Sequence, residues 1–165
     1  MSLPMKTLRD IDWDTWKAKD PATLVFVVKD GRILLIRKKR GLGAGKINAP
    51  GGRLEPGETP LEAAVREVQE ELCITPVELT YSGENLFQFV DGYSIHVHVF
   101  KAGDYQGEPT ETDEASPIWS NLDAIPYEEM WEDDELWVPL VLDGTRFYGR
   151  YLFDDDIMLD YALDY

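Results

Sequence analysis

The stretch Gly52–Ile74, GRLEPGETPLEAAVREVQEELCI, carries the strongest structural signal in this chain of 165 residues. Thr59, Pro60 and Glu62 predict the start of a helix, because Thr is a good cap, Pro fits the first turn and Glu completes a capping box. At 100° per residue, the apolar positions that follow form one stripe, which predicts the buried face of the helix. Its members are Leu61, Ala64, Val65, Val68 and Leu72.

Three carboxylates are predicted to share another face of this helix, well away from the apolar stripe. Glu67, Glu70 and Glu71 are spaced i, i+3 and i+4, which places them side by side. Like charges this close repel one another, and a hard divalent cation such as Mg²⁺, or alternatively Mn²⁺, relieves the repulsion by binding their oxygens. The ordinary alternative is a solvated acidic helix surface. The preceding Gly51-Gly52 favours the metal site, since it lets backbone approach phosphate groups.

The composition predicts one globular domain over residues 1–165, with residues 1–20 as an N-terminal extension. Met1–Leu3, followed by a second methionine at Met5, are interpreted as the remnant of an expression tag. Lys and Arg number 16 against 32 Asp and Glu, so the net charge is −16. This charge argues against nucleic-acid duplexes and anionic membranes as partners. It does not exclude a small nucleotide, because a metal in an acidic pocket binds its phosphates.

The single cysteine, Cys73, excludes an internal disulfide. No apolar run approaches the length of a membrane span, and the N-terminus lacks the apolar region of a signal peptide. We therefore expect a cytoplasmic protein. A monomer is the default expectation, since no symmetric apolar surface is evident in the sequence.

Segments of β character flank the predicted helix. Thr23–Val28 and Arg32–Lys38 form a predicted hairpin around Asp30-Gly31, and a second hairpin joins Asn85–Val90 to Ser94–Phe100. Later segments complete the pattern, together with a flexible loop and a solvated acidic turn. These are a short helix at Asp133–Leu142, a strand at Arg146–Phe153, the loop at Arg40–Gly45 and the turn at Asp154–Asp156. The pattern predicts an α/β fold with a mixed sheet and helices on its faces.

The stretch Gly52–Ile74 resembles the Nudix box, G-x5-E-x7-R-E-U-x-E-E-x-G-U, in which U is apolar. It departs at one position, since Cys73 stands where the pattern has glycine. The likeness extends over roughly residues 23–161 and is greatest to the MutT-type branch that hydrolyses oxidised purine nucleoside triphosphates. The further segments are KKRGLGAGKIN (38–48), HVF (98–100), MWEDDELW (130–137), FYGRYLF (147–153) and MLDY (158–161). The resemblance implies an α/β/α sandwich and Mg²⁺-dependent hydrolysis of a nucleoside diphosphate linked to another group.

The resemblance also implies roles for residues in and near the box. Glu67 and Glu71 become principal metal ligands, and Glu70 becomes a ligand or the general base. Glu114 matches a position that adds a carboxylate, and the alternative for it is an exposed loop acid. Gly51 is placed with the metal and phosphate groups. Glu58, Arg66 and Gly52 are assigned to orienting the site, the first two through an ion pair.

The same resemblance predicts a base pocket. Trp131 would stack on a purine, and Asp133 and Asp134 would read its edge, one of them protonated so that it donates. The remaining members are Asn48, whose amide can donate and accept, Phe87 and Phe89 as apolar walls on one strand face, and Lys38, with Arg53 as a weaker candidate, for phosphate. The alternative is that Trp131 and Trp137 are core residues and Asp133 caps a helix.

Two departures from that branch concern the pocket walls and the helix end. Leu42, Ile47 and Ala49-Pro50 stand where the branch has bulkier aromatic residues. The usual glycine at position 73 is expected to take a positive φ just beyond the helix, so either Cys73 adopts this conformation at a modest steric cost or the turn differs. The leading hypothesis is cleavage of oxidised purine nucleoside triphosphates to monophosphate and pyrophosphate. The alternatives are another diphosphate substrate, such as a dinucleoside polyphosphate or a capped RNA end, and a non-catalytic ligand sensor of the same fold.

Overall fold

A computed structural model describes residues 4–165, so the predicted tag remnant Met1–Leu3 lies outside the described residues. Its elements in chain order are η1 Leu8–Asp10, β1 Asp20–Lys29, β2 Arg32–Lys38, β3 Ile47–Asn48, β4 Gly51–Arg53, α1 Pro60–Leu72, β5 Thr75–Phe89, β6 Ser94–Gln106, β7 Ala115–Asn121, η2 Tyr127–Glu129, α2 Asp134–Asp143, β8 Phe147–Asp154 and β9 Ile157–Asp164. No helix within residues 4–165 is long and apolar enough to cross a membrane.

The strands form one mixed sheet with the order β3-β2-β1-β6-β5-β8-β9, while β4 pairs with β1 and β7 pairs with β2. Strand β1 is parallel to β6 and antiparallel to β2, and β5 is antiparallel to β6 and parallel to β8. Strand β1 also changes partner along its length. Ala22–Leu24 pair with β4, whereas Val27–Lys29 pair with β2. Between Leu24 and Val27, this edge of β1 therefore passes from one partner strand to the other.

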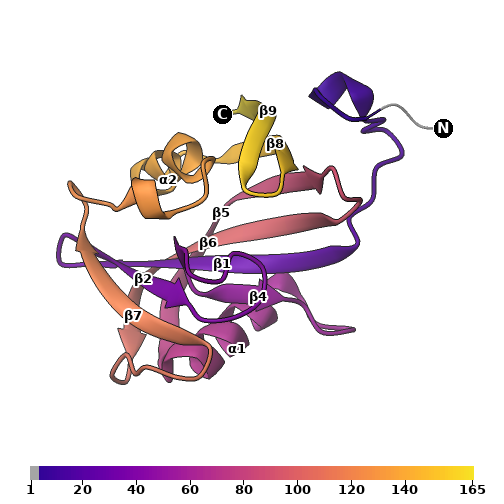
Figure 1. Cartoon of the computed structure of the whole chain (residues 1–165). Helices are drawn as coiled ribbons and strands as arrows, with labels where there is room; N and C mark the ends of the chain where they lie inside the picture. The colour runs from indigo at the N-terminus through magenta and orange to yellow at the C-terminus, as the bar shows by residue number, and fades with distance from the viewer. Residues whose placement is uncertain (1–3) are drawn as a thin grey trace.

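Helices α1 and α2 lie on opposite faces of the sheet (Figure 1), and a hydrophobic core lies under each of them. Alternation along β1 directs Phe26 to one face and Val25 and Val27 to the other. Helix α2 covers the Phe26 face, where Trp137 packs edge-on against Phe26 with ring centroids 5.6 Å apart. Helix α1 covers the opposite face with Ala64, Val68 and Leu72. This arrangement confirms the predicted α/β/α sandwich.

Both predicted hairpins are present, but the second is longer than predicted. Asp30 and Gly31 have φ values of 54° and 74°, as a tight hairpin turn requires. Strand β5 begins at Thr75 instead of Asn85, and β6 continues to Gln106 instead of Phe100. The added halves pair with each other from Thr75 opposite Gln106 onward. Pairing of this kind outweighs the strand-weakening residues Pro76, Glu78 and Gly83, which interrupt the β-forming residues of this half of β5. The acidic turn is confirmed, with Asp155 and Asp156 exposed between β8 and β9.

Helix α1 has the predicted start and nearly the predicted buried face. The Glu62 N–H donates to Thr59 Oγ1 at 3.1 Å, and the Thr59 N–H donates to the Glu62 carboxylate at 3.0 Å. The prediction for Leu61 is wrong, since it is 49% exposed, and Val65 is only half-buried. The buried face is rotated toward Glu71, which is itself buried. The carboxylate face and the apolar stripe therefore overlap, contrary to the expected separation.

Cys73 ends α1 in the left-handed region, with φ 61° and ψ 27°, which confirms the expected positive φ. A residue with a Cβ atom is strained there, so Cys73→Gly should raise the free energy of unfolding by about 0.5–1 kcal/mol. This figure is the relief of strain less the extra chain entropy of glycine. Urea denaturation measures it, with Cys73→Ala as the control that keeps the Cβ and should change little. A loss of stability in Cys73→Gly would contradict this account of the helix end.

Candidate active site

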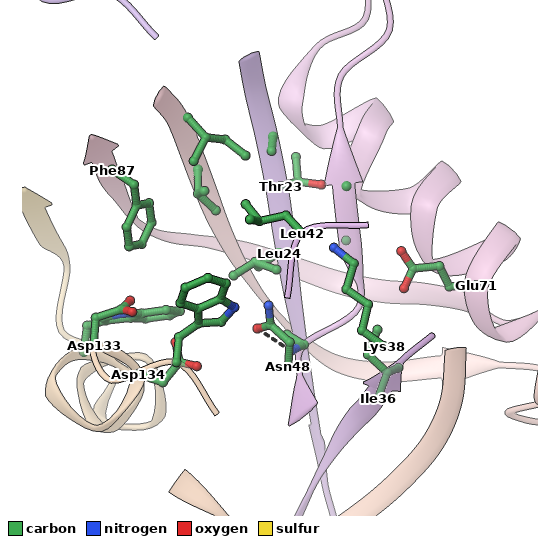
Figure 2. A pocket seen from close by; sticks show the side chains of 18 of the residues that line it. Thr23, Leu24, Ile36, Lys38, Leu42, Asn48, Glu71, Phe87, Asp133 and Asp134 are labelled. Atoms are coloured by element: carbon green, nitrogen blue, oxygen red, sulfur yellow. Dashed lines mark hydrogen bonds between the residues drawn. The ribbon is translucent and has the colours of Figure 1, made fainter. Parts of the chain in front are cut away.

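A cleft lies where β1 passes from β4 to β2, and it extends from α1 to the start of α2. Figure 2 shows Lys38 and Glu71 at one end of this cleft, Asp133, Asp134 and Phe87 at the other, and Asn48 and Leu24 between them. Segments that are distant in the sequence thus line one continuous space, with cationic and anionic groups at one end and aromatic and carboxyl groups at the other.

Three carboxylates gather at the α1 end of the cleft. Oxygens of Glu67, Glu71 and Glu114 all lie within 4.8 Å of one another. Glu67 and Glu71 are one helical turn apart on α1. Glu114 lies in the loop before β7. A hydrogen bond of 2.7 Å from Thr112 Oγ1 to the Glu71 carbonyl holds this loop against the end of α1. Glu114 also accepts a hydrogen bond of 2.9 Å from Arg40.

Glu70 stands apart from this group. Its side chain is 49% exposed and accepts a 3.2 Å hydrogen bond from Arg66. Of the four carboxylates expected at the metal site, the structure therefore brings Glu67, Glu71 and Glu114 together, while Glu70 is joined to Glu67 only through Arg66. The reason is the rotation of α1 described above, which turns Glu71 toward the sheet and Glu70 toward solvent.

Burial and crowding make this group of carboxylates fit a divalent cation. Glu71 is 5% exposed, and burial, together with the charge of Glu67, raises its pKa to about 8. Within residues 4–165, Glu71 Oε2 has no hydrogen-bond partner. Burial also raises the pKa of Glu67, although Arg66 opposes the shift. A buried carboxylate oxygen without a partner is unfavourable, and a hard cation with oxygen ligands supplies the missing interaction.

Arg66 connects the box loop to the carboxylates. Its guanidinium donates to both oxygens of Glu58, at 2.7 and 2.8 Å, and this contact lowers the pKa of Glu58 to about 2. It also donates to Glu67 at 2.9 Å and to the Arg53 carbonyl at 3.1 Å. The structure thus brings together the Glu58–Arg66 pair expected from the sequence, and the pair orients Glu67.

The two glycines before the box permit very close packing. A Cβ atom on Gly52 would lie 2.5 Å from the Glu67 carboxyl carbon, and one on Gly51 would overlap the Thr23 carbonyl group. Both glycines line the cleft. Backbone can therefore approach a ligand here where any larger residue would displace Glu67 or β1.

Lys38 lies at the same end of the cleft as Glu71 (Figure 2). Burial lowers the pKa of Lys38, and the charges of Glu71 and Glu67 oppose this shift. A lysine ammonium in this position suits contact with phosphate oxygens. The weaker candidate, Arg53, is 70% exposed, lies 3.5 Å from Asp20 in an ion pair and does not line the cleft.

Trp131 lines the opposite end of the cleft and is only partly buried. Its ring packs edge-on against Phe89 and Phe153, with centroid distances of 6.1 and 5.5 Å. Lys46 Nζ lies 5.3 Å from the ring centroid. Trp137, by contrast, is 1% exposed and belongs to the core, as the alternative interpretation held for it.

Asp133 and Asp134 begin α2 at this end and are almost fully buried. Asp133 Oδ2 accepts a 2.7 Å hydrogen bond from the Trp137 indole N–H, so its side chain does not cap the helix. Burial raises the pKa of Asp133 to about 6, and burial plus the neighbouring Asp133 raises the pKa of Asp134 well above its ordinary value. Asp133 Oδ1 and Asp134 Oδ2 lack partners in the described chain. Two unpaired carboxyl oxygens thus border the cleft.

The remaining walls are partly those expected. Phe87 and Phe89 line the cleft together, and Phe87 stacks on Tyr151 with centroids 4.8 Å apart. The Asn48 side-chain oxygen accepts from the Ala49 N–H at 2.8 Å, and its amide nitrogen points toward the middle of the cleft (Figure 2). Sequence reasoning missed the floor, although strand alternation could have found it. The floor consists of Ala22, Leu24, Ile95 and Val97.

The chain is similar to known proteins in both sequence and structure. Residues 18–141 match the family model for the NUDIX domain. A Danio rerio relative, named oxidized purine nucleoside triphosphate hydrolase, is 46% identical over 86% of this chain and 92% of its own. A Mus musculus relative of the same name is 42% identical over the same shares. A MutT protein structure from Bacillus halodurans has a TM-score of 0.80 at 30% identity, covering 88% of this chain and 97% of that chain.

Proposed function

Since this chain belongs to the NUDIX domain family, we propose that it is a Mg²⁺-dependent pyrophosphohydrolase of nucleoside triphosphates. Its proposed substrates are oxidised purine nucleotides such as 8-oxo-dGTP and 2-hydroxy-dATP, cleaved to monophosphate and pyrophosphate. The names of the relatives from Danio rerio and Mus musculus support this substrate class. A single domain over the whole chain, a monomeric state and a cytoplasmic location stay predictions from the sequence.

The observation that carries the proposal is the continuity of the cleft, in which one space is lined by Glu71, Trp131, Asp133 and Asp134. Glu67, Glu71 and Glu114 are proposed to hold the cation, which supplies charge neutralisation at the phosphoryl oxygens. Mn²⁺ would fit the same oxygen ligands. Glu70, at the exposed edge of this group, is proposed as a ligand or base that acts only once substrate is bound.

The chain's own residues then divide the substrate between them. Gly51, Gly52 and Lys38 are proposed to contact phosphates, because they line the carboxylate end. Trp131 is proposed to stack on the base, with Phe87 and Phe89 as apolar walls. Asn48, Asp133 and Asp134 are proposed to read the purine edge through their free amide and carboxyl atoms.

Pyrophosphate release tests the proposal. With Mg²⁺ and sub-saturating 8-oxo-dGTP, 2-hydroxy-dATP, dGTP and dATP, we expect the largest kcat/KM for an oxidised purine. A dinucleoside polyphosphate and a capped RNA end belong in the same panel. Faster cleavage of either of these would replace the proposed substrate class while leaving the carboxylate site in place.

Trp131→Ala should reduce kcat/KM for 8-oxo-dGTP by about 5–150-fold, which corresponds to the ~1–3 kcal/mol of a base stacked on an aromatic ring. The preference for 8-oxo-dGTP over dGTP should fall with it. Trp119→Ala is the matched control, since Trp119 packs beside Tyr105 outside the cleft. An unchanged preference in Trp131→Ala would show that the base binds elsewhere.

A further inference from the structure

A second group of ligating side chains lies on the face of the sheet opposite the floor of the cleft. His96 and His98 alternate along β6 with Ile95 and Val97, which line the cleft, so the two imidazoles point to the other face. Glu84 of β5 is directly opposite His98 in the strand register and diagonal to His96. These are the two histidines of the chain, and the proposed hydrolysis uses neither.

The three side chains converge closely. One nitrogen of each imidazole and one oxygen of Glu84 lie within 4.8 Å of one another. The imidazole rings are stacked, with centroids 4.4 Å apart and 29° between their planes. His96 Nε2 lies 3.6 Å from Glu84 Oε2, too far for a hydrogen bond, and is buried without a partner among residues 4–165. An unpaired buried nitrogen therefore faces a carboxylate oxygen.

The Tyr81 hydroxyl orients two members of this group, Glu84 and His98. It donates to Glu84 Oε2 at 2.9 Å and lies 3.0 Å from His98 Nδ1. The Tyr81 hydroxyl has one proton, which it donates to Glu84. The Tyr81 oxygen can therefore only accept a hydrogen bond from His98, whose Nδ1 must carry a proton. A neutral His98 then has its lone pair on Nε2.

We propose that Glu84, His96 and His98 form a binding site for a divalent transition metal of the zinc class. Two imidazoles and one carboxylate are a characteristic three-ligand set for Zn²⁺, which leaves a fourth position open. The three carboxylates of Glu67, Glu71 and Glu114 suit a hard cation instead, so the two sites differ in metal preference. The proposal is independent of the hydrolytic reaction.

The surroundings of the three ligands allow a metal ion to enter and allow the side chains to close around it. A hollow lined by Trp13, Trp16, Lys17 and Tyr148 borders Glu84 and His96. Ligand atoms arranged tetrahedrally around Zn²⁺ lie about 3.4 Å apart, given metal–ligand distances of about 2.0–2.2 Å. Because the three ligand atoms lie within 4.8 Å of one another, the side chains must close by at most about 1.4 Å. The Glu84 and His96 side chains are 31% and 30% exposed, which leaves them room to move.

The test uses the tag-free full chain and Co²⁺ as a spectroscopic probe for Zn²⁺. Excess Mg²⁺ is present throughout to occupy the carboxylate site. We expect visible d–d absorption that saturates at one Co²⁺ per chain and is displaced by Zn²⁺. Because the chain has two histidines, ¹⁵N spectra of the imidazoles should show both of them shifted by Zn²⁺. Absence of the absorption in the wild type would overturn the proposal, as would unshifted imidazoles.

Variants assign the ligands. His96→Gln and His98→Gln should each abolish the saturable absorption, and Tyr81→Phe should weaken Zn²⁺ binding by about 10–100-fold, as loss of an orienting contact does. Glu78→Gln, an exposed carboxylate on the same strand, is the matched control and should bind as the wild type does. Mg²⁺-dependent hydrolysis should persist in the histidine variants, which also reports that they fold. Undiminished Co²⁺ binding in His96→Gln would exclude this site.

Discussion

Glu71→Gln should lower kcat for Mg²⁺-dependent hydrolysis by about 10²–10³-fold, the usual effect of removing one group that stabilises transition-state charge. Glu71 is the buried member of the carboxylate group, and its Oε2 atom has no partner in the described residues. Gln keeps the shape of the side chain but removes the charge that a cation needs. Pyrophosphate release under saturating substrate measures the effect.

The same variant should be more stable than the wild type without metal, by about 1–3 kcal/mol, because it no longer buries an unpaired carboxylate. Addition of Mg²⁺ should raise the Tm of the wild type but not that of Glu71→Gln. An inactive protein with increased stability cannot owe its inactivity to misfolding. Full activity in Glu71→Gln would refute the proposed metal site, whereas the absence of Mg²⁺-dependent turnover in the wild type would favour the non-catalytic sensor.

Glu70→Gln is the matched comparison on the same helix. Glu70 is exposed and bonded to Arg66, so its replacement should leave kcat within about tenfold of the wild type if Glu70 only supports the site. A loss as large as that of Glu71→Gln would instead identify Glu70 as a base that reorients when substrate binds. The ratio of the two effects therefore decides the role of Glu70.

Local signals in the sequence predicted helix α1 well. The cap at Thr59, the capping box with Glu62 and the positive φ at Cys73 depend on a few adjacent residues, and all three are present. The rotation of the helix was not predictable in this way. It depends on packing against β1, which brings Ala63 and Glu71 into contact with the core side and leaves Leu61 exposed. For that reason Glu71 is buried and Glu70 is exposed, although the sequence pattern placed both on one face.

Long-range pairing explains the rest of what was missed. Pro76, Glu78 and Gly83 interrupt the β-forming residues in the first half of β5, and pairing with β6 stabilises this half as a strand. The resemblance supplied Glu114, which no local pattern connects to α1. The Glu84, His96 and His98 group required the register of β5 against β6. Alternation alone places His96 and His98 on one face but leaves Glu84 unassigned.

The second prediction with a large expected effect concerns which carboxyl group carries a proton, Asp133 or Asp134, at the end of the cleft proposed to hold the purine. Burial and the charge of Asp133 raise the pKa of Asp134 well above its ordinary range, whereas the indole N–H of Trp137 helps to keep Asp133 charged. At neutral pH we therefore expect Asp134 to donate a hydrogen bond and Asp133 to accept one. In the proposed base pocket, this combination would offer the purine edge one donor and one acceptor, side by side.

Stability against pH tests this assignment of the proton. Both carboxyls have folded pKa values above the unfolded value, so their contribution to stability is complete below about pH 4. It is lost as pH rises, through about 6 for Asp133 and at higher pH for Asp134. Asp134→Asn should remove the decline in stability at the higher pH. Glu71 titrates in an overlapping range, so both proteins should be compared in the Glu71→Gln background.

Catalytic measurements distinguish the two carboxyl groups more sharply than stability does, because the two Asn variants make the same chemical change at adjacent residues. Asp134→Asn keeps a neutral donor, so kcat/KM for 8-oxo-dGTP should stay within about tenfold of the wild type. Asp133→Asn replaces a charged acceptor and should reduce kcat/KM by about 10–150-fold, equivalent to the ~1.5–3 kcal/mol of a hydrogen bond to a charged group. The larger loss in Asp134→Asn would place the proton on Asp133. Equal and small losses would mean that neither carboxyl contacts the base.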